Sequence, residues 1–173
     1  MTNSSAVDRV ALDSCVIIDI LEGEKAKNPW IQHLLRDAQV KKIRLSASAM
    51  AACEVTHIAS LATAREKIMA FFRRRDIDVF PVDLPVADYV QEIAGLALGL
   101  KPADAIHVAT AALHGASVLL TRDAGGGRQR KSMLSLDQKN LPGAKSIRIM
   151  TPQAFHTMLA EKEDKPLFNK SEE

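Results

Sequence analysis

The sequence predicts an α/β layer fold with a mostly parallel sheet. Short β-rich runs alternate with longer helical runs along the chain, which is the pattern of strands joined by crossover helices. The continuous apolar run Val118-Leu119-Leu120 is typical of a central parallel strand that is buried on both faces. The 173 residues, 47% of them hydrophobic and 25% charged, fit a single domain and exclude disorder across the whole chain.

Five short runs carry the strand signal. Each is a β-rich stretch between longer helical patterns, and the run that contains Leu119 is the strongest of them. A sheet built from these runs has its loops, and therefore its ligands, outside the carboxyl ends of the strands. The expected strands are residues 9–12, 43–46, 77–82, 117–121 and 146–150.

The runs between the strands predict helices, several of them with a clear end signal. Pro29 can begin a helix with Trp30 on its apolar stripe, and Pro102 can begin a later one. The Ala-rich run 47–61 contains no Pro or Gly that would break a helix. Apart from the helix that begins at Pro29, helices are expected over residues 16–22, 47–61, 63–75, 84–98, 101–114 and 152–161.

Charge and composition exclude several classes of protein. The 23 Lys and Arg residues nearly balance the 21 Asp and Glu residues, so binding to nucleic acid must come from local patches. No apolar run approaches the ~20 residues of a membrane span, and the start of the chain is polar. We therefore expect a cytoplasmic protein with no membrane partner. Cys15 and Cys53 do not form a disulfide framework and are expected to be small apolar residues of the interior.

Four acidic residues stand at positions where a parallel sheet can bring them together. Asp13 follows the first strand and Asp123 the strongest one, whereas Glu54 and Asp104 lie on helices. Each has an ordinary explanation. Asp13 can be a helix N-cap, Asp104 suits the first turn of a helix, and Asp123 can form an Asx turn. Glu54 interrupts an apolar stretch, where an unpartnered carboxylate is rarely buried, although one face of that helix can be exposed to solvent.

Taken together, these acids favour a metal site. Clustered carboxylates repel one another unless protons or cations neutralise them. Mg²⁺ and Mn²⁺ prefer oxygen ligands and bind through carboxylates, water and substrate phosphate. The chemistry indicated is metal-assisted hydrolysis of a phosphodiester.

Four segments resemble the signature segments of the PIN-domain family, with the nearest likeness to bacterial VapC-type toxins. They are residues 10–18, 52–55, 101–109 and 119–123. The resemblance covers residues 9–155 and implies a three-layer α/β/α sandwich. It also implies an Mg²⁺- or Mn²⁺-dependent endoribonuclease of single-stranded RNA that forms a homodimer and is inhibited by a cognate antitoxin protein.

The resemblance assigns roles to individual residues. The four acids would hold one or two metal ions and orient the attacking water, and two hydroxyl residues would support them. The acidic positions are Asp13, Glu54, Asp104 and Asp123, and the supporting hydroxyl positions are Thr121 and Ser14.

The chain departs from the family pattern in three places. Cys15 stands where members often carry Asn. Three glycines follow Asp123, where members often place another acid and an aromatic residue; the next acid, Asp137, is either that acid displaced or an ordinary loop residue. The inserted segment is also basic, and either guides RNA phosphates or is a solvated loop. The expected RNA contacts are Arg122, Arg128, Arg130 and Lys131.

The resulting domain plan has three parts. A disordered N-terminal arm is expected over residues 1–8, a PIN-like nuclease domain over 9–161 with a basic Gly-rich insertion loop at 124–137, and a charged C-terminal tail over 162–173.

Two other functions fit parts of the sequence. A PIN-like domain can bind RNA or protein without cleaving anything. A more distant alternative is a di-iron carboxylate protein, because Glu54 and His57, and likewise Asp104 and His107, have the Glu-x-x-His type of spacing.

Overall fold

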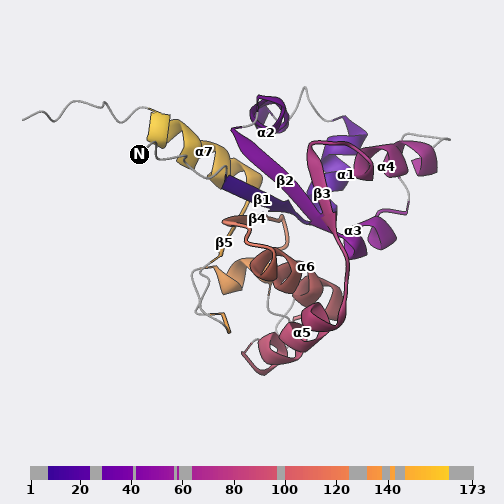
Figure 1. The fold of residues 1–173 in the computed structure, drawn as a ribbon. Coiled ribbons are helices and arrows are strands. Elements are labelled where there is room, and N and C mark those ends of the chain that lie inside the picture. Colours follow the sequence, from indigo (N-terminus) through magenta and orange to yellow (C-terminus); the bar gives the residue numbers. More distant parts are fainter. Residues whose placement is uncertain are drawn as a thin grey trace, which may run out of the picture.

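In the computed structural model of this protein, a five-stranded sheet forms the centre of the molecule (Figure 1). The structure describes residues 8–23, 29–40, 42–56, 58, 64–96, 100–124, 132–137, 141–142 and 147–163. The strands are β1 (Asp8–Leu12), β2 (Ile43–Ser48), β3 (Ile77–Phe80), β4 (Val118–Leu120) and β5 (Arg148–Met150).

All four strand pairings are parallel, and the spatial order is β3-β2-β1-β4-β5. The predicted α/β class is confirmed, and the sheet is parallel throughout. From β1 the chain builds outward through β2 to β3, and then crosses to the other side of β1 to form β4. The strand order therefore reverses between β1 and β4, which is where ligands bind in open sheets of this kind.

Helices cover both faces of the sheet. They are α1 (Ser14–Glu22), α2 (Pro29–Gln39), α3 (Ala49–Glu54), α4 (Ala64–Phe72), α5 (Leu84–Leu96), α6 (Pro102–Leu113) and α7 (Pro152–Glu163), with a short 3-10 helix, η2 (Met133–Leu136).

Two hydrophobic cores lie on opposite faces of the sheet, because successive side chains of a strand point to opposite sides. Leu12 and Leu120 face a core that includes residues of α1, α2, α4 and α7. Ala11 and Leu119 face the second core, which is formed with α5, α6 and η2. The two helical layers are visible on either side of the sheet in Figure 1. The predicted three-layer sandwich is therefore confirmed.

The helix predicted over residues 47–61 is wrong in extent. Ala47 and Ser48 belong to β2, where they pair with Val79 and Phe80 of β3, and α3 covers only Ala49–Glu54. Helix propensity is a local preference that strand pairing overrides. Every other predicted element that has a predicted end agrees with the structure to within three residues at each end.

Part of the segment predicted as an insertion loop forms a short helix. Residues 133–136 form η2, with Met133 and Leu136 in the core, whereas residues 125–131 lie outside the described part of the chain. Asp8, assigned to the N-terminal arm, begins β1, and residues 162–163 of the predicted tail end α7. Residues 1–7 and 164–173 are also outside the described part.

Two further expectations concern helices. The di-iron alternative is wrong, because those proteins are built on four long helices and this molecule is built on a parallel sheet. Among the described residues, none of the helices has the length and apolar character needed to cross a membrane.

Candidate functional site

The candidate site lies at the carboxyl ends of β1 and β4. Leu12 of β1 pairs with Leu120 of β4, so the residues that follow the two strands emerge side by side. The backbone N–H of Asp13 donates to the carbonyl of Leu120 at 3.0 Å. Asp13 and Thr121 are therefore brought together by strand pairing alone.

The Asp13 carboxylate is buried and accepts hydrogen bonds on both oxygens. Its side chain is the N-cap of α1, as predicted, because Oδ1 accepts from the Ser14 N–H at 2.6 Å. The Ser14 hydroxyl also donates to Oδ1, at 3.2 Å. Oδ2 accepts from the Thr121 hydroxyl at 2.7 Å and from the Cys15 thiol at 3.0 Å. These contacts hold both oxygens in one orientation.

Glu54 reaches the site from the last turn of α3. Its Oε2 lies 2.7 Å from Nε2 of His107 on α6, and the same nitrogen lies 3.6 Å from Oδ1 of Asp13. The hydrogen bond with His107 holds the pKa of Glu54 below its usual value, against the opposing effect of burial. Glu54 is thus a partnered carboxylate rather than a solvent-facing helix residue.

Asp104 and Asp123 complete the acidic group. Burial, followed by the negative charges of Asp123 and Asp13, raises the pKa of Asp104. Asp123 is positioned by its own backbone, whose N–H donates to the Thr121 hydroxyl at 2.9 Å, and its Oδ2 accepts from the Met133 N–H at 3.3 Å. We call Asp13, Glu54, Asp104 and Asp123 the acidic site.

Part of this site has the donor chemistry of a metal centre. Asp13, Glu54 and His107 each offer one ligand atom, and these three atoms lie within 4.8 Å of one another. Two carboxylate oxygens and one imidazole nitrogen are ligands that divalent cations accept. Burial, and then the negative charges of Asp123 and Asp13, raise the pKa of Asp104, and a cation would relieve the part that is due to charge. The residues present therefore fit the divalent metal that the sequence predicts.

Comparison with known families identifies the fold. The family model of the PIN domain matches residues 10–130, a span that contains all four acids. The chain belongs to the PIN domain family. No curated protein sequence matches it.

Solved structures similar to this PIN domain come from toxin–antitoxin complexes. A chain of VapBC2 from Rickettsia felis, bound to a promoter DNA fragment, has a TM-score of 0.56 at 12% identity over 82% of this chain and 96% of that one. A chain of DNA-bound VapBC from Salmonella typhimurium has a TM-score of 0.54 at 20% identity, over 84% and 98%. A toxin–antitoxin complex from Klebsiella pneumoniae has a TM-score of 0.54 at 19% identity, over 83% and 97%. At these identities the likeness is one of fold.

The basic residues expected to contact RNA are only partly described. Arg122 follows Thr121 at the site, and its Nε pairs with the buried Asp19 of α1 at 2.9 Å. Its side chain remains 50% exposed. The other three, Arg128, Arg130 and Lys131, lie outside the described residues.

Asp137 lies against β5 in this PIN domain. Its Oδ1 accepts from the backbone N–H of Ile149 at 2.7 Å and from Nε of Arg148 at 3.1 Å. These contacts tie the residue after η2 to the edge strand of the sheet. They favour the structural explanation of Asp137 over that of a displaced site acid.

The expectation of an interior position is wrong for Cys53, which is exposed on α3. Cys15 is partly buried and packs against the hydrophobic core, as expected, but it also has polar contacts. Cys15 lies in the site, where its Sγ donates to Asp13 and accepts from the Arg122 N–H at 3.2 Å. Burial, and then the nearby charge of Asp13, raises the pKa of Cys15 to about 12, so the thiol stays protonated at neutral pH.

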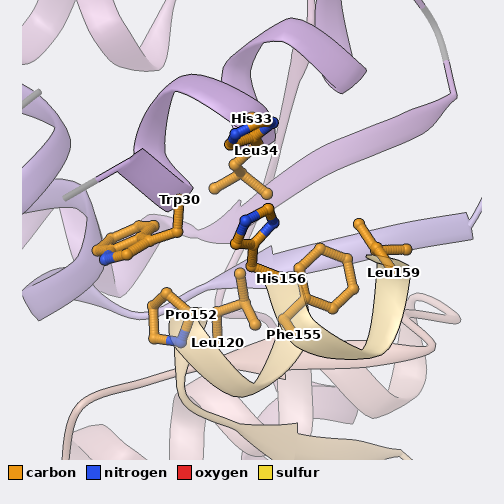
Figure 2. A pocket seen from close by; sticks show the side chains of 8 residues that line it. All are labelled: Trp30, His33, Leu34, Leu120, Pro152, Phe155, His156 and Leu159. Carbon is orange, nitrogen blue, oxygen red and sulfur yellow. The ribbon is translucent and has the colours of Figure 1, made fainter. Parts of the chain in front are cut away.

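A separate pocket lies between α2 and α7 (Figure 2). Its lining is mainly apolar, with two imidazole rings stacked at a centroid distance of 4.4 Å, those of His33 and His156. None of the four acids lines it. The remaining lining residues are Trp30, Leu34, Leu120, Pro152, Phe155 and Leu159. None of its lining residues is a carboxylate that could hold Mg²⁺ or Mn²⁺, so the acidic site remains the candidate for metal-assisted chemistry.

Two residues at the site, His107 and Ser48, are not identified as part of a metal centre by the sequence alone. The sequence points to His107 only through its spacing from Asp104, which is of the di-iron type, and it predicts Ser48 inside a helix. In the structure Ser48 ends β2, and its Oγ lies 3.0 Å from Nδ1 of His107. The i, i+3 spacing of Asp104 and His107 was the available signal, because it places both on one face of α6.

Proposed function

We propose that this PIN domain is a metal-dependent endoribonuclease that hydrolyses phosphodiester bonds of single-stranded RNA. The observation that carries the proposal is the clustering of acids at the carboxyl ends of β1 and β4, where ligand atoms of Asp13, Glu54 and His107 lie within 4.8 Å of one another. Holding like charges together costs stability unless a cation neutralises them. A domain that served only as a scaffold would have no reason to confine them.

The four acids would hold one or two Mg²⁺ or Mn²⁺ ions. The bound metal supplies Lewis-acid polarisation of the scissile phosphodiester. Asp13 is preorganised to hold a metal ion because Thr121 and Ser14 fix both of its oxygens. Asp104, which lies near the charges of Asp123 and Asp13, would help to hold the metal and to orient the attacking water.

We further propose that the protein is the toxin of a type II toxin–antitoxin pair. The likeness of its fold to chains of VapBC complexes supports this role. Such a protein would act on RNA in the cytoplasm, form a homodimer and bind a cognate antitoxin. Basic side chains beside the site would contact RNA phosphates, namely Arg122, Arg128, Arg130 and Lys131.

Cleavage of a labelled single-stranded RNA tests the nuclease proposal. The protein is incubated with and without Mn²⁺ beside Asp13→Asn, with Asp88→Asn as the matched control because Asp88 is exposed on α5. We expect cleavage that requires Mn²⁺, is unaffected by the control change and falls by on the order of 10²–10³ in Asp13→Asn. Equal cleavage by Asp13→Asn and wild type would contradict the assignment.

Growth of cells that express the protein tests the toxin proposal. Wild type is expected to arrest growth, and Asp13→Asn, expressed at the same level, is not. Normal growth with active wild-type nuclease would remove the toxin role and leave the nuclease in place.

A further inference from the structure

We propose that His107 is itself a metal ligand, through Nε2, and that it shifts the site's preference from Mg²⁺ toward transition-metal ions such as Mn²⁺ and Co²⁺. Ser48 acts as a positioning residue that holds the imidazole in place. This inference rests on the proposed function, because it concerns the metal of the same site.

The distances around Nε2 suit a shared ion. Nε2 of His107 lies 2.7 Å from Oε2 of Glu54 and 3.6 Å from Oδ1 of Asp13. Adjacent ligands of an octahedral ion with bonds of about 2.1 Å are about 3.0 Å apart, a value between these two distances. His107 is 2% exposed, so its nitrogen is directed at the carboxylates and not at solvent.

Ser48 provides independent support. It occupies the N-cap position of α3, where a serine usually accepts a hydrogen bond from the helix backbone, yet its side chain makes no capping bond. Its Oγ instead lies 3.0 Å from Nδ1 of His107, and both residues are buried. In the absence of metal, Nε2–H donates to the Glu54 carboxylate. A cation that takes the place of this proton requires the tautomer with its proton on Nδ1, and the Ser48 hydroxyl can accept that Nδ1–H. Metal-binding histidines are commonly held in this way by their second nitrogen.

The nitrogen ligand has a consequence for the choice of ion. Mg²⁺ favours oxygen ligands, whereas imidazole suits first-row transition metals, whose affinity for such sites rises from Mn²⁺ to Co²⁺ and beyond. A site of carboxylates alone would be more tolerant of Mg²⁺. With His107 as a ligand, the protein should discriminate between the two kinds of ion. With His107 only a hydrogen-bond partner of Glu54, it should not.

Electron spin echo spectroscopy of the Mn²⁺-loaded full-length protein tests ligation directly and needs no variant. We expect nitrogen modulation from a coordinated imidazole, which changes when the histidines are labelled with ¹⁵N. The chain has five histidines, so the modulation must also disappear in His107→Gln and persist in His156→Gln. Bound Mn²⁺ without imidazole modulation, or modulation that survives in His107→Gln, would overturn this inference and leave the proposed nuclease intact. A protein that binds none of these metals would overturn both.

Calorimetric titration with Mn²⁺ and Mg²⁺ tests selectivity. His107→Gln should weaken Mn²⁺ binding by at least about tenfold and Mg²⁺ binding by much less, and Ser48→Ala should weaken Mn²⁺ binding by about tenfold. His156→Gln is the matched control. Equal losses for the two ions would show that His107 acts only through Glu54. Thermal unfolding of each variant without metal shows whether it is folded, and the spectroscopic test on wild type stands if one is not.

Discussion

Carboxylates at the two ends of the sheet have opposite kinds of neighbour. Toward the amino ends of the strands, Asp78 of β3 accepts hydrogen bonds from Arg44 at 2.8 Å and from Arg9 at 3.4 Å, so the acid is neutralised by guanidinium groups. At the carboxyl ends, Asp104 lies near the negative charges of Asp123 and Asp13, which, after the larger effect of burial, raise its pKa. The first arrangement stabilises the fold, whereas the second is useful only if a cation or a proton joins it.

This contrast separates structural from functional carboxylates within one domain. Arg9 also donates to the His114 carbonyl and lies 5.3 Å from the centroid of the Phe80 ring, which stacks on the His114 ring. Such a network joins β1, β3 and the end of α6. Changes at this end should therefore lower stability, and changes at the acidic site should lower activity.

The largest effect is expected from Asp104→Asn. Cleavage should fall by on the order of 10²–10³, because a carboxylate that would hold the metal and orient the attacking water is lost. Without metal the variant should be at least as stable as wild type, since a repelled carboxylate becomes neutral. Cleavage assays and thermal unfolding in a chelator measure the two effects, with Asp88→Asn as control. A variant that loses stability and activity together would contradict the division between the two ends.

Arg9→Met removes contacts at the other end of the sheet, near the amino ends of the strands. Asp78 would lose one partner, and the His114 carbonyl and the Phe80 ring would lose their contact with the guanidinium. We expect a loss of roughly 1–3 kcal/mol in the free energy of unfolding, with metal binding and cleavage unchanged. Denaturant unfolding measures the loss. Arg65→Met, on an exposed position of α4, should change stability by less than about 0.5 kcal/mol. Similar losses in the two variants would argue against a structural network at Arg9.

Most of the fold and part of the site could be predicted from the sequence. Asp13 and Asp123 were found because carboxyl ends of parallel strands share an edge of the sheet, whatever the details of packing. The end of β2 was missed because Ala47 and Ser48 are strand residues only through their pairing with β3. That error also hid the contact between Ser48 and His107, which depends on how α6 packs against β2 and has no counterpart in local sequence.

A smaller effect on cleavage is expected from substitution of Cys15, which contacts both Asp13 and Arg122. Its thiol donates one of the hydrogen bonds to Asp13. Loss of that donor in Cys15→Ala should cost about 0.5–1.5 kcal/mol, which corresponds to a fall in cleavage of at most about tenfold. Cys15→Ser keeps a donor and should retain nearly full activity. Measured kcat/KM values test this, with Cys53→Ala, an exposed position, as control. Equal loss in the serine and alanine variants would exclude the hydrogen bond as the cause.

The smallest effect is a pH dependence of stability in which two acids of the site have opposite signs. The pKa of Glu54 is lowered by its hydrogen bond with His107, so its contribution is present above its unfolded pKa and is lost as pH falls through the folded value. The pKa of Asp104 is raised by burial and by Asp123, so stability is lost as pH rises through its folded value.

Two variants separate these contributions in metal-free protein. Thermal unfolding in a chelator is measured from about pH 3.5 to about pH 7, a range that spans the ordinary carboxyl pKa values. Relative to wild type, Asp104→Asn should become more stable as pH rises, and Glu54→Gln should become less stable. Added Mn²⁺ should reverse the advantage of Asp104→Asn, because the cation stabilises only a site that keeps its carboxylates. An advantage that does not vary with pH would mean that the Asp104 charge is not what the fold resists.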